Sequence, residues 1–245
     1  MRKPFFIYCL SLFSLNGNCQ VYYNDSALVS GSSKYVINFY NKARHDFNPL
    51  YNGLVHYSYT NIDEGTPYFS GENWYKGSVI YEDNIYDSVL MKYDLVKDQL
   101  IVMAEENNRM PLQLFSPRVK EFSYAGLKFI FIPANAALAL KEGFYQQLSN
   151  GKIMALSRTE NTIEEVIVGD HLERKITQRK KYYIIDNNRT RTINRQRDLM
   201  DAVKKHRQQI NDHLRSKRLK FKKNKQLIIT AATDLYNKLE SQNNE

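Results

Sequence analysis

Cysteine is almost absent from this chain of 245 residues, and both cysteines, Cys9 and Cys19, lie close to the N-terminus. From Gln20 onward there is no thiol to form a disulfide, act as a nucleophile or bind a metal. Small disulfide-stapled scaffolds and thiolate metal centres are therefore excluded for this part of the chain. Its stability must come from a packed core, and its length suffices for one large or two small domains.

Motifs of catalysis are missing as well. Glycine is scarce, with ten residues, and no glycine-rich phosphate loop, nucleophile elbow, H-E-x-x-H or S-x-x-K set occurs. His206 and His213 have too few carboxylates nearby for a metal site. The acidic pairs Asp63-Glu64, Glu105-Glu106 and Glu164-Glu165 do not suit glycoside hydrolysis, because adjacent strand residues point to opposite faces. We predict a protein that is not an enzyme and uses neither cofactor nor metal.

Long hydrophobic runs are absent after the N-terminus, and we expect no transmembrane helix in the mature chain. Residues 1–19 have the pattern of a signal peptide, with Arg2 and Lys3 before an apolar stretch at residues 5–15. Cleavage after Cys19 suits the small-residue rule better than lipidation of Cys19, but both alternatives remain open. We expect export to the periplasm, to an outer-membrane-associated state or to the medium.

Positive charge is concentrated in the second half of the chain. Residues 20–134 contain ten Lys and Arg against thirteen Asp and Glu, whereas residues 135–245 contain twenty-three against thirteen. Residues 174–225 alone contain nineteen against four, a net charge of +15. Such asymmetry indicates an anionic partner or a merely solvated basic face. Because of the export signal, we expect an anionic envelope surface or an acidic protein and no nucleic acid.

Apolar residues that recur at every second position predict a mainly antiparallel sheet of about ten strands between residues 50 and 194. Before it lies an N-terminal segment at 20–49, in which we expect a short helix at 34–44. The sheet is a meander, with a partial barrel as an alternative. The expected strands are 54–59, 75–82, 85–93, 100–104, 110–115, 119–123, 127–132, 144–148, 152–157, 181–186 and 190–193. We expect Ile85, Val89, Met91 and Tyr93 to share one face.

Residues 195–245 change to helical spacing and predict a basic helical hairpin packed on the sheet, which makes the fold class α+β. Leu199, Val203, His206, Ile210 and Leu214 form one stripe of a first helix. A second helix follows Asn224, a candidate N-cap.

Two groups of residues are candidate binding sites. The first is a cationic patch between the two helices, where the basic residues alternate with Leu219 and Phe221: Arg215, Lys217, Arg218, Lys220, Lys222 and Lys223. This pattern is typical of a segment on an anionic surface, or of a connector whose Leu and Phe cap the core. The second is an aromatic binding face at Trp74 and Tyr75, for which ordinary core packing is the alternative.

The chain resembles uncharacterised exported proteins of Bacteroidetes in several short motifs. They include residues 77–81 (GSVIY), Tyr93-Asp94, residues 143–145 (GFY), residues 182–184 (YYI) and Leu235-Tyr236. The resemblance implies an envelope-facing β domain with a basic helical tail and assigns no activity. We expect a non-catalytic envelope protein that binds an anionic or amphiphilic partner through its basic C-terminal half. The alternatives are a lipid or lipoprotein carrier and an unrecognised hydrolase.

Overall fold

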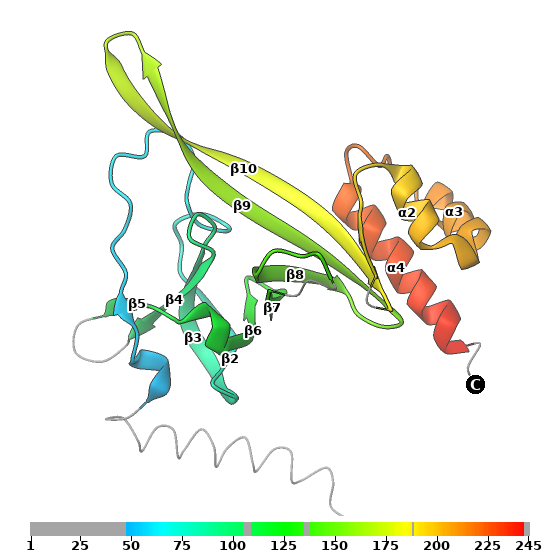
Figure 1. Ribbon diagram of the computed structural model, residues 1–245, viewed down its shortest axis with the longest axis horizontal. Helices are drawn as coiled ribbons and strands as arrows, with labels where there is room; N and C mark the ends of the chain where they lie inside the picture. The colour runs from blue at the N-terminus through cyan, green and yellow to red at the C-terminus, as the bar shows by residue number, and fades with distance from the viewer. Residues whose placement is uncertain (1–47, 105–108, 135–137, 188, 243–245) are drawn as a thin grey trace, which may run out of the picture. The chain divides into compact units, whose positions relative to one another are not determined.

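The computed structural model describes residues 48–104, 109–134, 138–187 and 189–242 (Figure 1). The predicted signal peptide, the short helix expected at residues 34–44 and the Glu105-Glu106 pair lie outside these residues. Among the described residues, no helix is long and apolar enough to cross a membrane.

The described residues form one antiparallel sheet of eleven strands, in the order β1-β5-β4-β3-β2-β6-β7-β8-β9-β10-β11. This confirms the predicted α+β class with an antiparallel meander. No ladder joins β1 to β11, so the sheet is open. The strands are β1 (Leu54–Val55), β2 (Tyr75–Tyr81), β3 (Asn84–Asp94), β4 (Gln99–Ala104), β5 (Met110–Gln113), β6 (Val119–Tyr124), β7 (Leu127–Ile132), β8 (Gly143–Ser149), β9 (Ile153–Val168), β10 (His171–Asp186) and β11 (Arg189–Thr192).

The first part of the sheet curls around a core of aromatic rings. Tyr93 of β3 and Phe144 of β8 have three strands between them in the sheet, yet their ring centroids are 5.7 Å apart. Phe122 stacks on Phe129 at 4.8 Å and meets Phe144 edge-on at 5.1 Å. These rings fill the inside of the curl, and their burial supplies the main hydrophobic stabilisation of this region.

The prediction that Ile85 shares a face of β3 with Val89, Met91 and Tyr93 is wrong. Ile85 is 43% exposed, whereas Tyr86, Val89, Met91 and Tyr93 are buried. The cause is a β-bulge, because the two residues between Tyr86 and Val89 oppose a single residue of β2. The extra residue reverses the alternation, which a pattern of strict period two does not anticipate.

β9 and β10 form a hairpin much longer than the sequence predicted. Its ladder has sixteen residue pairs, from Ile153 opposite Asp186 to Val168 opposite His171. The sequence pattern predicts strands only at 152–157 and 181–186, where both faces carry apolar residues. The outer part has solvated faces and is stabilised by pairing with its partner strand, so it lacks the apolar alternation that marks a half-buried strand.

A segment before β2 braces this hairpin along the outer edge of β10. The Asp63 N–H donates to the carbonyl of Arg174 at 2.9 Å, and the Ile176 N–H donates to the carbonyl of Glu64 at 2.9 Å. On the β9 side, the Asn161 N–H donates to the carbonyl of Leu95 at 3.1 Å. The predicted strand at 54–59 ends already at Val55. The His56 N–H still donates to the carbonyl of Pro111 at 2.8 Å, but proline has no N–H to return the bond, so the ladder stops there.

The helical region packs on the base of the hairpin and on β11 (Figure 1). It consists of α2 (Gln196–Ala202), a 3-10 turn η4 (Lys204–His206), α3 (Arg207–Ser216) and α4 (Lys225–Gln242). Ile153, Ala155, Tyr182 and Ile184 from β9 and β10 share a buried cluster with apolar residues of all three α-helices. The helices therefore stabilise the hairpin base through a second hydrophobic core.

The first predicted helix is divided into α2 and α3 by η4. Lys205 Nζ and His206 Nε2 both reach Glu240 Oε1 of α4, at 2.7 and 2.5 Å. Both residues therefore connect η4 to α4, and the three-helix arrangement replaces the expected two-helix hairpin.

Candidate functional site: a basic helical end and a buried polar network

All six residues of the predicted cationic patch are exposed on the segment from the end of α3 to the start of α4. We call Arg215, Lys217, Arg218, Lys220, Lys222 and Lys223 the connector cations. Among the described residues, none of them lies within ion-pair distance of a carboxylate. Leu219 and Phe221 pack against the second core. The apolar residues fix the connector to the fold, and the cations remain in water.

The connector belongs to a larger basic surface, which we call the basic helical end (residues 179–225). It contains seventeen Lys and Arg and four Asp and Glu, a net charge of +13. In the described residues, Arg197 and Lys205 are its two cations with a carboxylate within 4.0 Å. The excess charge is therefore not neutralised within the fold, and its field extends into the solvent over about a Debye length.

Lys180, Lys225 and Tyr182 come together in the fold at the edge of this surface, although no sequence pattern relates them. Lys225 Nζ lies 5.1 Å from the centroid of the Tyr182 ring, and Lys180 Nζ lies 5.8 Å from it. Lys180 Nζ also donates to Gln226 Oε1 at 2.6 Å. Partial burial lowers the pKa of Lys225, and nearby Asp198 opposes this shift. These residues come from β10 and α4, so only the tertiary fold reveals the cluster.

The predicted aromatic pair does not form a common face. Trp74 and Tyr75 are both half-buried, but Tyr75 packs against the aromatic core and meets Tyr124 edge-on at 5.2 Å. Trp74 lies beside Lys92, whose Nζ is 5.1 Å from its ring centroid. Lys92 also contacts Tyr68 and Glu72. Tyr75 is the first residue of β2 and lies opposite buried Met91, whereas Trp74 precedes the strand, which explains the separation.

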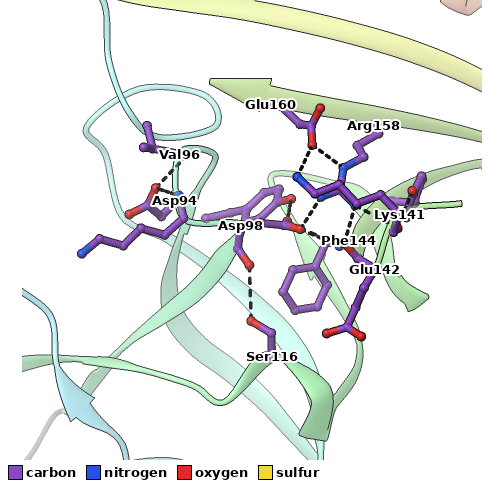
Figure 2. A network of polar contacts seen from close by, with 12 residues as sticks. Asp94, Val96, Asp98, Ser116, Lys141, Glu142, Phe144, Arg158 and Glu160 are labelled. Atoms are coloured by element: carbon purple, nitrogen blue, oxygen red, sulfur yellow. Dashed lines mark hydrogen bonds and ion pairs between the residues drawn. The ribbon is translucent and has the colours of Figure 1, made fainter. Parts of the chain in front are cut away.

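A buried polar network joins the β3–β4 turn to β8 and β9 (Figure 2). The guanidinium of Arg158, whose side chain is 4% exposed, is at its centre. It donates to Asp98 Oδ2 at 2.8 Å, to Glu160 Oε1 at 2.9 Å and to the carbonyl of Glu142 at 3.0 Å. The Tyr93 hydroxyl donates to Asp98 Oδ1 at 2.6 Å. The Arg158 fork therefore holds three segments that are distant in sequence.

Gly143 is required where this network crosses β8. A Cβ at this position would lie 1.8 Å from Asp98 Oδ2 and 2.6 Å from Arg158 Nη1, and its φ of +136° disfavours other residues. The Phe144 N–H donates to the same carboxylate at 3.3 Å. The close approach of the backbone lets Asp98 accept bonds from a side chain and a main-chain amide at once.

The two carboxyl groups of the network have opposite pKa shifts. Burial raises the pKa of Asp98, although Tyr93, Arg158 and the Phe144 amide favour the ionised form. Burial also opposes ionisation of Glu160, but hydrogen bonds from Lys141 and Arg158 outweigh it and lower the pKa of that group. Opposite shifts are typical of acid–base pairs in active sites and also of structural ion-pair networks.

The network is better explained as a structural clamp than as an active site. A pocket of about 300 Å³ beside it is lined by Asp98, Lys141, Arg158 and Glu160. These groups are already bonded to one another: Lys141 Nζ contacts Glu160 Oε1 at 3.1 Å, and Arg158 contacts both carboxylates. Each charged group of this set therefore already has a partner of opposite charge within the set.

Replacing Glu160 by glutamine should reduce stability most at neutral pH. Its pKa is lower in the folded chain than its ordinary value, so the folded state binds fewer protons than the unfolded state near that pKa. The stabilisation is therefore present at neutral pH and is lost as the pH falls through the folded pKa. We expect E160Q to lower the unfolding free energy at pH 7 by about 1 kcal/mol.

This difference should shrink as the pH falls from about 5 to about 3, measured by urea unfolding at each pH. E121Q is the matched control, because the Glu121 side chain is 32% exposed, close to the 30% of Glu160, but pairs with Lys128, at 2.8 Å, rather than with a buried arginine. A stability loss in E160Q that stays constant from neutral to acidic pH would contradict this explanation.

The acidic pairs found in the sequence also have structural partners. Asp63 Oδ2 accepts from the Arg174 N–H at 2.7 Å, Glu64 pairs with Lys175 at 3.3 Å and Glu165 pairs with Arg174 at 3.0 Å. No group of three or more histidine, cysteine, aspartate or glutamate residues in the described chain could hold a metal ion.

Comparison with protein families gives no matching family model, and comparisons with curated proteins and with solved structures give no significant match. Function must therefore be argued from the basic helical end and from the rest of the described surface.

Proposed function

We propose that this protein is exported and binds an anionic or amphiphilic partner through its basic helical end, without catalysis. The observation that carries the proposal is the set of six connector cations, which are exposed and have no carboxylate partner among the described residues. A cation that is paired with a carboxylate of the same fold has its charge neutralised there. These cations are free to interact with an external anion.

The arrangement also supports an interaction of useful strength. A cation close to an anionic membrane surface contributes on the order of 1 kcal/mol, and six of them fall within nine residues. Half-buried Leu219 and Phe221 lie between them, and Leu227 at the start of α4 is 55% exposed. Apolar groups beside cations match an amphiphilic partner, with an anionic head and an apolar part.

The rival functions receive less support from the described residues. A lipid carrier needs an open apolar interior, but aromatic rings at centroid distances of 4.8–5.7 Å occupy the inside of the curled sheet. A hydrolase needs free acid–base groups, and the carboxylates of the buried network are bonded to Arg158. The predicted signal peptide supports an envelope partner over nucleic acid.

Removal of the connector charge tests the proposal. A variant with R215Q, K217Q, R218Q, K222Q and K223Q should bind vesicles containing phosphatidylglycerol at least about 100-fold more weakly than the wild type, measured by flotation at low salt. Wild-type binding should also weaken steeply with added salt and be absent on purely zwitterionic vesicles.

A control variant separates the connector from net charge. K76Q, K97Q, R109Q, K120Q and K152Q remove five exposed cations elsewhere in the described chain, so the change in total charge is the same. We expect less than about a threefold effect from this variant. Salt-insensitive binding, or equal losses in the two variants, would contradict the proposal.

A further inference from the structure

The far end of the β9–β10 hairpin exposes apolar side chains that a solvated loop does not need. Val166, Ile167, Val168 and Leu172 are 41%, 77%, 39% and 52% exposed, respectively. Ile167 and Leu172 stand directly opposite each other in the ladder, so their side chains lie on one face. We call these four residues the apolar tip. Clustered exposed apolar residues mark interaction sites more often than single ones.

Carboxylates surround the apolar tip. Glu164, Glu165, Asp170 and Glu173 lie within residues 164–175, against Arg174 and Lys175. The bracing segment adds Asp63 and Glu64 beside β10, which gives six acidic and two basic residues, a net charge of −4. The Asp170 side chain is fully exposed. This charge disfavours an anionic lipid surface and favours a partner that has cations around apolar groups.

The same chain has such a surface at the other end of the hairpin. The helices pack on Ile153, Ala155, Tyr182 and Ile184 at its base, whereas the apolar tip is at the turn after Val168. At about 3.3 Å per step, the thirteen steps from residue 155 to residue 168 span about 43 Å. A continuous ladder of sixteen pairs keeps the hairpin extended, so the tip cannot reach the basic helical end of its own chain.

β9 has a free edge beside the apolar tip. Its ladder with β8 ends at Ser157, and Asn161 bonds to Leu95. Beyond Asn161, no backbone hydrogen bond from the described residues reaches the outer edge of β9. An open strand edge next to apolar side chains is a recurrent template for association with another chain.

We infer that the apolar tip of one copy of this protein docks on the basic helical end of a second copy. The inference rests on the proposed function, because it names an acidic, amphiphilic partner for the same basic site. Charge complementarity carries it: a net charge of −4 around the apolar tip meets a net charge of +13 over residues 179–225. Exposed Leu227 and half-buried Phe221 provide apolar contact for Ile167 and Leu172.

The contact is head-to-tail, since the two surfaces differ and lie at opposite ends of one hairpin. A heterologous contact of this kind leaves one free tip and one free basic end in every oligomer. Association therefore continues to longer chains unless the geometry closes a ring. It should also be weakened by salt, as expected for contacts between opposite charges.

Two variants, each lacking one half of the contact, test the inference. The double substitution I167K and L172K removes the apolar tip. The five connector substitutions remove the basic surface on which the tip docks. In sedimentation velocity at low salt and up to about 0.1 mM protein, where micromolar affinities are visible, the wild type should form oligomers. Each variant alone should be monomeric. An equimolar mixture should form 1:1 dimers and nothing larger, because the intact apolar tip and the intact basic helical end are on different chains.

Several results would overturn the inference: a monomeric wild type, a tip variant that still self-associates, or a mixture that stays monomeric. Vesicle binding separates it from the proposed function. The tip variant should bind phosphatidylglycerol vesicles as well as the wild type does, which would leave the basic site intact. Loss of vesicle binding in the tip variant would assign the tip to lipid and contradict docking to a second copy. Far-UV circular dichroism confirms that both variants fold.

Discussion

Replacing Arg158 by methionine should lower the free energy of unfolding by about 3–5 kcal/mol, the range for breaking a buried ion pair by removing one partner. Arg158 is buried and donates to Asp98, to Glu160 and to the carbonyl of Glu142. Methionine fills part of the volume but leaves the Asp98 carboxylate in a desolvated place without its cation. The effect should appear as a lower urea midpoint with an unchanged slope.

Two further substitutions control this prediction. R174M removes an arginine from the same hairpin whose side chain is 40% exposed and pairs with Glu165, so we expect a loss of at most about 1 kcal/mol. R158K retains the charge but not the planar fork that bonds to several acceptors, so its loss should be intermediate. A loss in R158M no larger than in R174M would show that the buried network does not clamp the fold.

Replacing Phe122 by alanine should cost about 3–5 kcal/mol, the range for a buried phenylalanine. Phe122 is 1% exposed and contacts three rings of the aromatic core, Phe129 at 4.8 Å, Phe144 at 5.1 Å and Tyr93 at 5.4 Å. Alanine leaves a cavity between strands that the rings hold together across the curl. Thermal unfolding followed by near-UV circular dichroism would report both the stability and the loss of ring packing.

Phe115 is the matched control, because it has the same side chain in an exposed position. It is 58% exposed, and the Arg118 guanidinium lies 5.6 Å from its centroid. F115A should therefore change the unfolding free energy by less than about 0.5 kcal/mol. Similar losses in F122A and F115A would contradict an aromatic core inside the sheet.

Most strands could be predicted because their faces differ in polarity. The alternation of Leu127, Phe129 and Phe131 predicts that they share a face, and all three pack against the aromatic core. The Asn150-Gly151 pair between two apolar runs predicts a hairpin, and the structure has one there, between β8 and β9. Local pattern and turn chemistry are sufficient where one side of a strand is buried. They are insufficient at the β3 bulge, where one extra residue changes the face of Ile85.

The candidate sites also differ in whether the sequence could predict them. The connector cations were predictable because they are close in sequence and interleaved with the apolar residues that attach them. The buried network was not, since Asp98 and Arg158 are sixty residues apart and no spacing relates them. The apolar tip was missed for another reason. Its valines and isoleucine are ordinary strand formers, and only the fold shows that nothing covers them in the described structure.

Lysine reactivity measured by mass spectrometry, with and without phosphatidylglycerol vesicles, tests most directly whether the basic helical end is the binding surface. Exposed amines that contact the partner lose reactivity, whereas amines elsewhere keep it. We expect protection of Lys217, Lys220, Lys222 and Lys223, with Lys76, Lys120 and Lys152 unchanged as exposed internal controls. Equal reactivity of the connector lysines in the free and bound protein, or protection confined to the control lysines, would contradict it.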